Sequence, residues 1–333
     1  MKNAGLYITT VLVWGSTWLA ITFQLGSVDP MVSVCYRFGL AGALLLAGCL
    51  AARQNLRFSL VQHGFMALQG VLLFSVNYWF VYMAETRMAS GLVAVVFSTI
   101  VFFNVLNGYW LLKVPVKPGM VFGAVVGMAG VCILFLPEIR SFSLSDQGLS
   151  GMAFCLGGVF LASLGNITSA RNQKFNLPVL QTNGFGMVYG SLAMTGIALF
   201  LGKPFTMVWT WGYVLSLGYL AVFGSILAFG CYLTLIGRIG PDRASYAIML
   251  VPAVALVFSS LFESYQWTAH SIMGLGLVMA GNLMVLKEKS SAGTRSFLPV
   301  RLRAVMAEAV NRLPAPLLRA AGLLGTARGV SGK

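Results

Sequence analysis

An internal duplication constrains the fold of this chain more than any other feature. Five hydrophobic spans are followed by five more, and the same glycine spacing recurs 151 residues later. Gly123 and Gly130 mark the end of the first half, Gly274 and Gly281 mark the end of the second, and both stretches finish with Met-Ala-Gly. Because an odd number of spans reverses the chain direction, the two halves are predicted to lie in opposite orientations in a bilayer. Such inverted repeats are typical of transporters whose site lies between the halves.

The composition of the chain is that of a membrane protein. Hydrophobic residues make up 58% of the 333 residues and charged residues only 9%, whereas about a quarter of a soluble protein is charged. Segments long enough to cross ~30 Å of hydrocarbon recur throughout the sequence. We therefore predict an all-α polytopic membrane protein with ten transmembrane helices, arranged as two inverted five-helix repeats. The predicted spans are residues 5–23, 31–52, 64–84, 90–111, 118–136, 150–170, 179–201, 212–236, 241–262 and 267–286.

The predicted spans divide the chain into four parts. Residues 1–137 form the first repeat, 138–149 an outer linker, 150–289 the second repeat and 290–333 a basic cytoplasmic tail. Part of the tail is amphipathic, which is consistent with an interfacial helix on an anionic leaflet or with a poorly ordered segment. We do not expect the tail to carry the chemistry of the protein.

The 22 Lys and Arg residues are distributed unevenly between the two sides of the predicted bundle. With the N-terminus inside, 18 of them lie on the inner side and 3 on the outer side, and Arg37 lies within a span. Because Lys and Arg concentrate in cytoplasmic loops, this bias predicts that both termini are cytoplasmic. The net charge of +14 is therefore explained by Lys and Arg on the inner side of the membrane, and no nucleic-acid partner is expected.

Arg37 is the most informative single residue. It lies about two turns into the second span, ~10 Å below the predicted outer boundary. An arginine at this depth costs several kcal/mol unless it is paired or wetted. Two interpretations are equally plausible: a fixed charge that meets a carboxylate or phosphate in a wet cavity, or a structural clamp on helix-end carbonyls. Snorkelling toward the interface is a third, weaker interpretation.

The stretch Trp14–Trp18 lies near the middle of the first span, and Thr17 and Trp18 are predicted at about the depth of Arg37. Trp14 and Trp18 are unusual near the middle of a span, since tryptophan prefers the interface. Gly15 leaves space beside the rings, and Ser16 and Thr17 add hydroxyl groups. Such a wall suits a small amphipathic solute. Tight helix packing around the Gly-Ser step is the alternative.

Several other polar or aromatic residues fall within spans. One of them alone is more often a helix–helix hydrogen bond than a ligand contact, because buried amides need partners in lipid. Their spread over many helices nevertheless predicts a polar interior. The candidates for substrate contact are Asn77, Tyr78, Trp79, Asn166 and Tyr232, and further polar mid-span residues are Asn104, Asn183 and Tyr189.

A second group of residues is predicted to shape the helices. Pro252 removes a backbone hydrogen bond in the ninth span, so it either exposes a carbonyl to a site or produces a simple packing kink. The small residues Gly123, Gly130, Gly274 and Gly281 allow close helix packing, and smooth glycine surfaces on which the halves rock are the second interpretation.

Two carboxylates end predicted spans on the outer side. Either Glu85 or Glu263 could bind a proton during transport. Their boundary positions favour solvated surface groups instead. Without a buried carboxylate, proton coupling has no support from the sequence, and passive exchange remains an alternative.

Catalytic chemistry has little support in the sequence. The chain has only two histidines, and no zinc-protease, Walker or nucleophile-elbow motif occurs. The five cysteines all fall in spans without metal-ligand spacing, as expected for small apolar fillers. We therefore expect neither an enzyme nor a cofactor or metal. An intramembrane protease or lipid-modifying enzyme is the weaker alternative, and a channel is disfavoured because no filter-like segment stands out.

These features together resemble the drug/metabolite transporter superfamily, EamA type. The resemblance rests on residues 13–18, on Pro30 followed by Arg37, on 250–252 followed by Glu263, and on the glycine pattern ending at Gly281. It covers about residues 1–288. It is fairly specific for the superfamily and not for any substrate.

The resemblance implies a secondary carrier of the bacterial inner membrane with a central cavity walled by both repeats. Such carriers often export amino acids or related metabolites by alternating access, with protons as the default coupling ion. The matching residues are Trp14, Gly15, Ser16, Arg37 and Pro252. The competing hypotheses are an uptake carrier for another solute and a membrane sensor or assembly protein that transports nothing.

Two positions depart from the family pattern. Ser98 stands where the first repeat often has proline, and Leu112 stands near the usual place of an acidic residue. The first repeat is therefore expected to bend less than the second.

Overall fold

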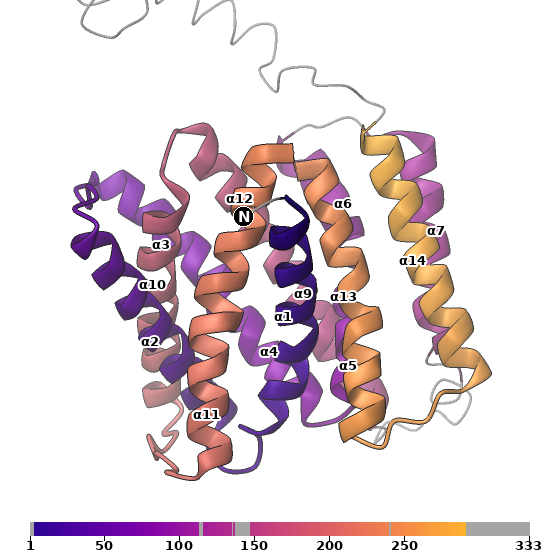
Figure 1. Cartoon of the computed structure of the whole chain (residues 1–333), viewed down its shortest axis with the longest axis horizontal. Helices are drawn as coiled ribbons and strands as arrows, with labels where there is room; N and C mark the ends of the chain where they lie inside the picture. The colour runs from indigo at the N-terminus through magenta and orange to yellow at the C-terminus, as the bar shows by residue number, and fades with distance from the viewer. Residues whose placement is uncertain (1–2, 113–115, 135, 137–146, 240, 291–333) are drawn as a thin grey trace, which may run out of the picture. The chain divides into compact units, whose positions relative to one another are not determined.

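The computed structural model describes residues 3–112, 116–134, 136, 147–239 and 241–290, and all regular structure in this part of the chain is helical (Figure 1). The helices are α1 (Asn3–Thr22), α2 (Pro30–Ala51), α3 (Leu60–Phe74), α4 (Val76–Glu85), α5 (Ser90–Phe97), α6 (Ile100–Leu112), α7 (Pro118–Leu134), α9 (Gln147–Lys174), α10 (Val179–Phe200), α11 (Trp211–Tyr219), the π-helix η1 (Leu220–Leu227), α12 (Ala228–Ile239), α13 (Pro241–Phe262) and α14 (Ala269–Ser290).

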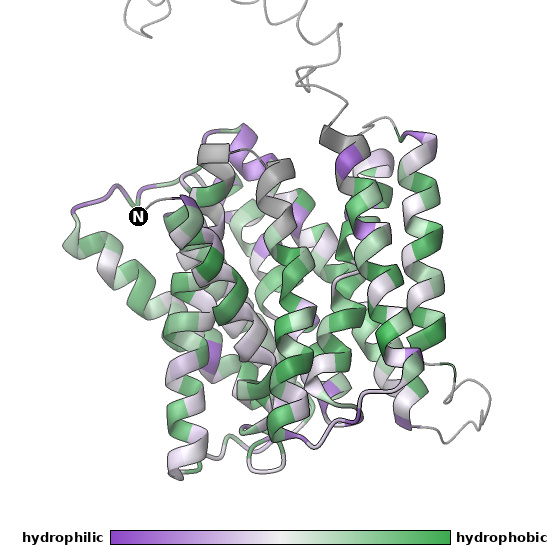
Figure 2. Ribbon diagram, turned by 45° about the vertical axis from the view of Figure 1, so that its right-hand side comes forward, coloured by the Kyte–Doolittle hydropathy of each residue, from purple (hydrophilic) through white to green (hydrophobic). Residues whose placement is uncertain are grey.

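Every predicted span holds a helix or a consecutive run of helices, so the predicted all-α membrane architecture is confirmed. Six stretches of the described chain are long and apolar enough to cross a membrane, and three shorter apolar helices accompany them. Figure 2 shows hydrophobic residues along most of the helix lengths, with hydrophilic residues gathered mainly at the ends. The largest difference in bounds is α9, which extends the predicted span 150–170 at both ends because helical geometry continues into the flanking polar residues.

The start of α1 and the end of α14 lie at the same end of the bundle (Figure 1). This agrees with an even number of passes through the bundle between these two points. The predicted tail, 290–333, lies outside the described residues except for Ser290, and the predicted linker, 138–149, does so up to residue 146.

Local sequence signals start the helices that position the candidate site. Pro30 opens α2, and the Asp29 carboxylate caps it by accepting a hydrogen bond of 2.9 Å from the Met31 N–H. Asp29 also pairs with Lys203 at 3.0 Å. This fixed start places Arg37 two turns into α2.

The fourth span is divided into two α-helices where the ninth span is a single one, and the expectation about bending stays a prediction. The α-helix is interrupted at Ser98 and Thr99, which form a turn between α5 and α6, whereas α13 continues through Pro252. The Ser98 and Thr99 hydroxyls donate to the carbonyls of Val95 and Val96, each at 2.7 Å. Such local side-chain bonds compete with the backbone ladder of a helix, so serine and threonine interrupt this span without a proline.

The two glycine-rich stretches of the repeats pack against each other. Helices α7 and α14 run side by side at one edge of the bundle (Figure 1). A Cβ placed on Gly123 would lie 2.8 Å from the Gly281 carbonyl, and one on Gly130 would lie 2.8 Å from the Gly274 carbonyl. Backbone therefore meets backbone at both points, which only glycine permits.

Candidate functional site

Arg37 lies inside the bundle, with only 1% of its surface exposed. Its Nε donates to the Ser225 hydroxyl at 3.3 Å. The guanidinium carbon stands 4.6 Å from the centre of the Tyr78 ring and 5.1 Å from that of Phe38, within range of cation–π attraction. The Nη1 nitrogen has no hydrogen-bond partner. Among the described residues no carboxylate lies within ion-pair distance of Arg37, so its buried positive charge has no direct ion-pair partner.

The π-helix η1 supplies the partner of Arg37. The Ser225 hydroxyl donates to the Leu220 carbonyl five residues earlier at 2.9 Å and accepts from Arg37. The carbonyl of Gly224, the residue before Ser225, accepts from the Trp14 indole at 3.2 Å. A π-turn often marks a functional site because it turns side chains and carbonyls away from their usual directions. Sequence reasoning missed Ser225, since nothing in the sequence of the span 212–236 signals a π-turn.

Trp14 and Gly15 join α1 to the second half of the chain. The Trp14 ring lies 5.1 Å from both Phe229 and Tyr232, so the predicted Trp14 and Tyr232 are neighbours. Gly15 faces α13, where a Cβ would overlap the side chain of Val254. The absence of a side chain at Gly15 therefore brings α1 close to α13, two residues beyond Pro252.

The remaining residues of this stretch point in different directions. The Ser16 and Tyr219 hydroxyls share a hydrogen bond of 2.6 Å, and Thr17 donates to the Trp14 carbonyl at 2.8 Å. The Trp18 ring packs 5.3 Å from Phe97, while its indole nitrogen is buried without a partner. Trp18 thus keeps a free donor inside the bundle.

A buried polar cluster surrounds the C-terminal end of α4 and consists of Gln24, Arg37, Tyr82 and Glu85. The Tyr82 hydroxyl donates to the side-chain oxygen Oε1 of Gln24 at 2.6 Å, and Tyr82 interacts electrostatically with both Arg37 and Glu85. The Gln24 amide nitrogen and both Glu85 oxygens are buried without hydrogen-bond partners. Buried polar groups are normally paired. A cluster with this many open donors and acceptors is therefore suited to receive a polar ligand.

The expectation that both outer carboxylates are solvated was wrong for Glu85. Only 7% of Glu85 is exposed, because the end of α4 packs inside the bundle. Glu263 is partly buried and accepts hydrogen bonds from the Ser90 N–H at 3.3 Å and the Ser90 hydroxyl at 2.5 Å. It thus satisfies the first turn of α5, as an acidic group at a helix N-terminus does.

The other predicted contact residues are distributed over separate places. Asn77 is 1% exposed, and its side-chain amide oxygen is buried without a hydrogen-bond partner. Trp79 packs beside Phe80, with ring centres 5.3 Å apart. Asn166 donates to Asn104 at 3.4 Å and so joins α9 to α6. The structure thus brings Tyr78 and Arg37 together and places Asn166 in a helix–helix contact, while the binding roles of all these residues stay predictions.

A network of amides joins α3, α9 and α10. Gln69 donates to Asn183 at 2.9 Å, and Asn172 donates to Gln69 at 3.0 Å. The sequence singled out Asn183 but not its partners. Because these amides satisfy one another, the network is a structural link between helices and not an open site.

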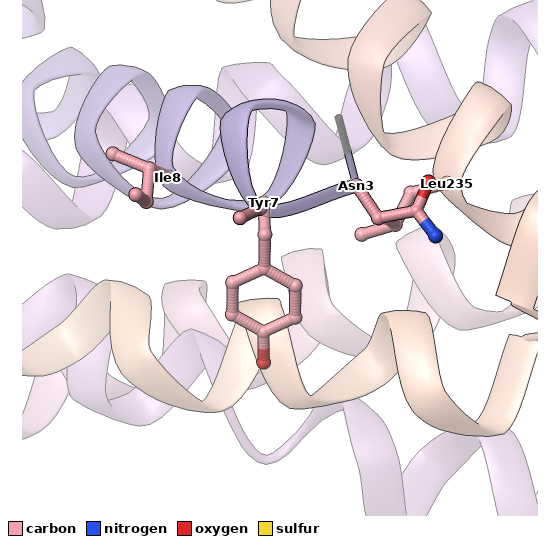
Figure 3. Close-up of a pocket in the computed structure, with 5 residues that line it drawn as sticks. Asn3, Tyr7, Ile8 and Leu235 are labelled. Carbon is pink, nitrogen blue, oxygen red and sulfur yellow. The ribbon is translucent and has the colours of Figure 1, made fainter. Parts of the chain in front are cut away.

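A hollow of about 300 Å³ opens elsewhere, beside the first turns of α1 (Figure 3). It is lined by Asn3, Ala4, Tyr7, Ile8 and Leu235. It holds none of the unpaired polar atoms of the buried polar cluster. Within the described residues no group of three or more His, Cys, Asp or Glu could hold a metal ion. The buried polar cluster, together with Tyr78 beside Arg37, is therefore the candidate site.

A model of the EamA-like transporter family matches the chain twice, over residues 2–136 and 149–287. The chain belongs to this family. The EamA-like chain is therefore a membrane transporter, and its family implies a small-molecule substrate. The two matches lie close to the predicted repeats, although the division into domains stays a prediction.

Named relatives agree with the family assignment. The chain is 28% identical over 292 residues to "Uncharacterized inner membrane transporter YedA" of Escherichia coli strain K12, covering 83% of this chain and 89% of that protein. It is 20% identical to "Protein PagO" of Salmonella typhimurium strain LT2, covering 84% and 91%. It is 22% identical to "Uncharacterized transporter YoaV" of Bacillus subtilis strain 168, covering 83% and 94%.

A solved structure also shares the fold. It is titled "Crystal structure of protein" and superposes with a TM-score of 0.64 at 17% identity, covering 88% of this chain and 99% of that chain. At this identity the likeness shows the fold alone. The family indicates a membrane transporter, and the name of YedA assigns that relative to the inner membrane.

Proposed function

We propose that this EamA-like transporter is an inner-membrane exporter of amino acids or related small metabolites that works by alternating access. The single observation that supports this proposal most is the buried guanidinium of Arg37, which has no carboxylate partner and keeps Nη1 open. Arginine stays protonated in proteins and binds carboxylates through two parallel hydrogen bonds. An anionic group of a substrate would supply the missing ion-pair partner.

The surroundings of Arg37 fit a small amphipathic solute. The rings of Phe38 and Tyr78 stand beside the guanidinium. Because Arg37 is 1% exposed, no aqueous solute reaches it in this conformation. Access would require the helices to part, which is the motion that alternating access supplies. The proposed orientation has both termini in the cytoplasm and the two repeats in opposite orientations, as the distribution of Lys and Arg predicts.

The test is untargeted metabolite profiling of the growth medium. Cells producing the wild type are expected to accumulate one class of amino acid or related solute outside, compared with cells carrying an empty vector. Cells producing Arg37→Leu at matched membrane abundance serve as the transport-defective control. A medium from wild-type cells that is indistinguishable from that of empty cells contradicts export, and flux into proteoliposomes of purified protein then tests uptake.

A further inference from the structure

Glu85 is a buried carboxyl group that no hydrogen bond in the described structure satisfies. It is the last residue of α4, and both its oxygens are buried without partners. An ionised carboxylate in such surroundings costs several kcal/mol. The group therefore has to bind a proton, or gain a partner when the helices part. Both are changes that a transport cycle can use.

The ionisable groups around Glu85 have opposite effects on its ionised form. A charge on Glu85 is repelled by Glu263, at the end of α13, and attracted by Arg37 on α2. Tyr82 and Cys155 interact with Glu85 from α4 and α9. Arg87 lies two residues further on, but its guanidinium turns to the Met83 carbonyl and stands 4.7 Å from the Phe154 ring. Arg37 is thus the cation that can stabilise an ionised Glu85.

The other helices packed on α4 add no charge near Glu85. Helix α5 contains no ionisable side chain. The ionisable residues Tyr7 of α1 and His63 of α3 lie in the first two turns of their helices, at the end of the bundle opposite to the end of α4 (Figure 1).

We infer that Glu85 is the residue that binds the coupling proton, an inference that rests on the proposed exporter function. The Glu85 carboxylate takes one proton from outer water and becomes a neutral carboxylic acid. It releases that proton to the cytoplasm when a cationic group of the substrate pairs with the carboxylate, while Arg37 holds the substrate's anionic group. Proton and substrate cannot occupy the carboxylate together. One proton moving inward is therefore exchanged for one substrate molecule moving outward.

The inference predicts that Glu85→Gln separates exchange from proton movement. The full chain is reconstituted in proteoliposomes, with a pH-sensitive dye in the lumen and a mixture of the twenty amino acids as the probe. When an amino-acid gradient is imposed across the membrane, wild-type protein is expected to move protons in the direction opposite to the amino-acid flow. Glu85→Gln is expected to reduce this proton movement at least tenfold while retaining labelled amino-acid counterflow, because glutamine can accept a hydrogen bond but cannot exchange a proton.

Glu263→Gln is the matched control, since its amide oxygen can still accept from Ser90. It should keep more than half of the proton movement. Proton movement by Glu85→Gln at the wild-type rate overturns the inference. If wild-type protein shows no counterflow of any amino acid, the proposed function fails instead.

Infrared difference spectroscopy of the purified protein decides the proton site without any substrate. The wild type should show a pH-dependent band of a protonated carboxylic acid that persists in Glu263→Gln and disappears in Glu85→Gln. A spectrum unchanged by Glu85→Gln overturns the inference, including the case in which that variant has lost all transport.

Discussion

Replacing Arg37 with leucine is expected to reduce transport about 100-fold or more at matched membrane abundance. Two charge-assisted hydrogen bonds to a substrate anion are together worth about 3 kcal/mol, and each 1.4 kcal/mol is a factor of ten. Leucine keeps much of the apolar stem that packs near Phe38 and Tyr78 but removes every donor. The measurement is the initial rate of counterflow of the exported solute in proteoliposomes.

Arg37→Lys distinguishes charge from geometry at the same position. Lysine keeps the positive charge but lacks the planar fork that binds a carboxylate at two points and stacks on rings. We expect it to recover only part of the loss, to about 10-fold below wild type. Full activity of Arg37→Lys would show that charge alone is needed.

Arg87→Leu is the matched control for these variants. Arg87 also stands over an aromatic ring, that of Phe154, and makes side-chain hydrogen bonds. It lies beyond the end of α4 and is not a member of the buried polar cluster. Its replacement should change the rate by less than about twofold. Wild-type rates for Arg37→Leu would mean that the substrate binds elsewhere.

Replacing Gly281 with alanine is expected to destabilise the protein by about 1–3 kcal/mol, the usual cost of overpacking a core. A Cβ at this position would lie 2.5 Å from both the Gly123 carbonyl oxygen and the Gly127 nitrogen. These atoms belong to the backbone of α7 and cannot move aside without moving the helix. Thermal unfolding in detergent, followed by fluorescence-detected size exclusion, should show a melting temperature about 5 °C lower.

Gly276→Ala is the control for Gly281→Ala on the same helix. A Cβ at Gly276 meets nothing within 4 Å, so the melting temperature should stay the same or rise slightly through better helix propensity. Equal melting temperatures for the two variants would show that α7 and α14 do not depend on their close approach.

The helices could be predicted because the signals that form them are local. A hydrophobic run of about 20 residues has to become a helix in lipid, where its backbone groups find no water to bond. The depth of Arg37 followed directly from its distance to the start of α2, since Pro30 and Asp29 fix that start. The repeated glycines Gly123 and Gly281 likewise indicated close packing, although not which helices would meet.

The site could be predicted only in part, because its geometry depends on contacts between distant segments. Arg37 and Ser225 are 188 residues apart, and Ser225 lies in the π-helix η1. No sequence signal in the span 212–236 predicts that π-helix. The break at Ser98 depends on hydroxyls bonding to the preceding turn, which the sequence allows but does not require.

The sequence by itself determined that this chain is a helical membrane protein with two similar halves and one arginine within a hydrophobic span, because span length, charge and repetition are properties of the chain alone. Only the tertiary structure decided that Glu85 is buried and Glu263 is hydrogen-bonded. Both carboxylates end hydrophobic helices and look alike in sequence. Their difference arises from the helices packed around each, which set the exposure and the partners of a charged group.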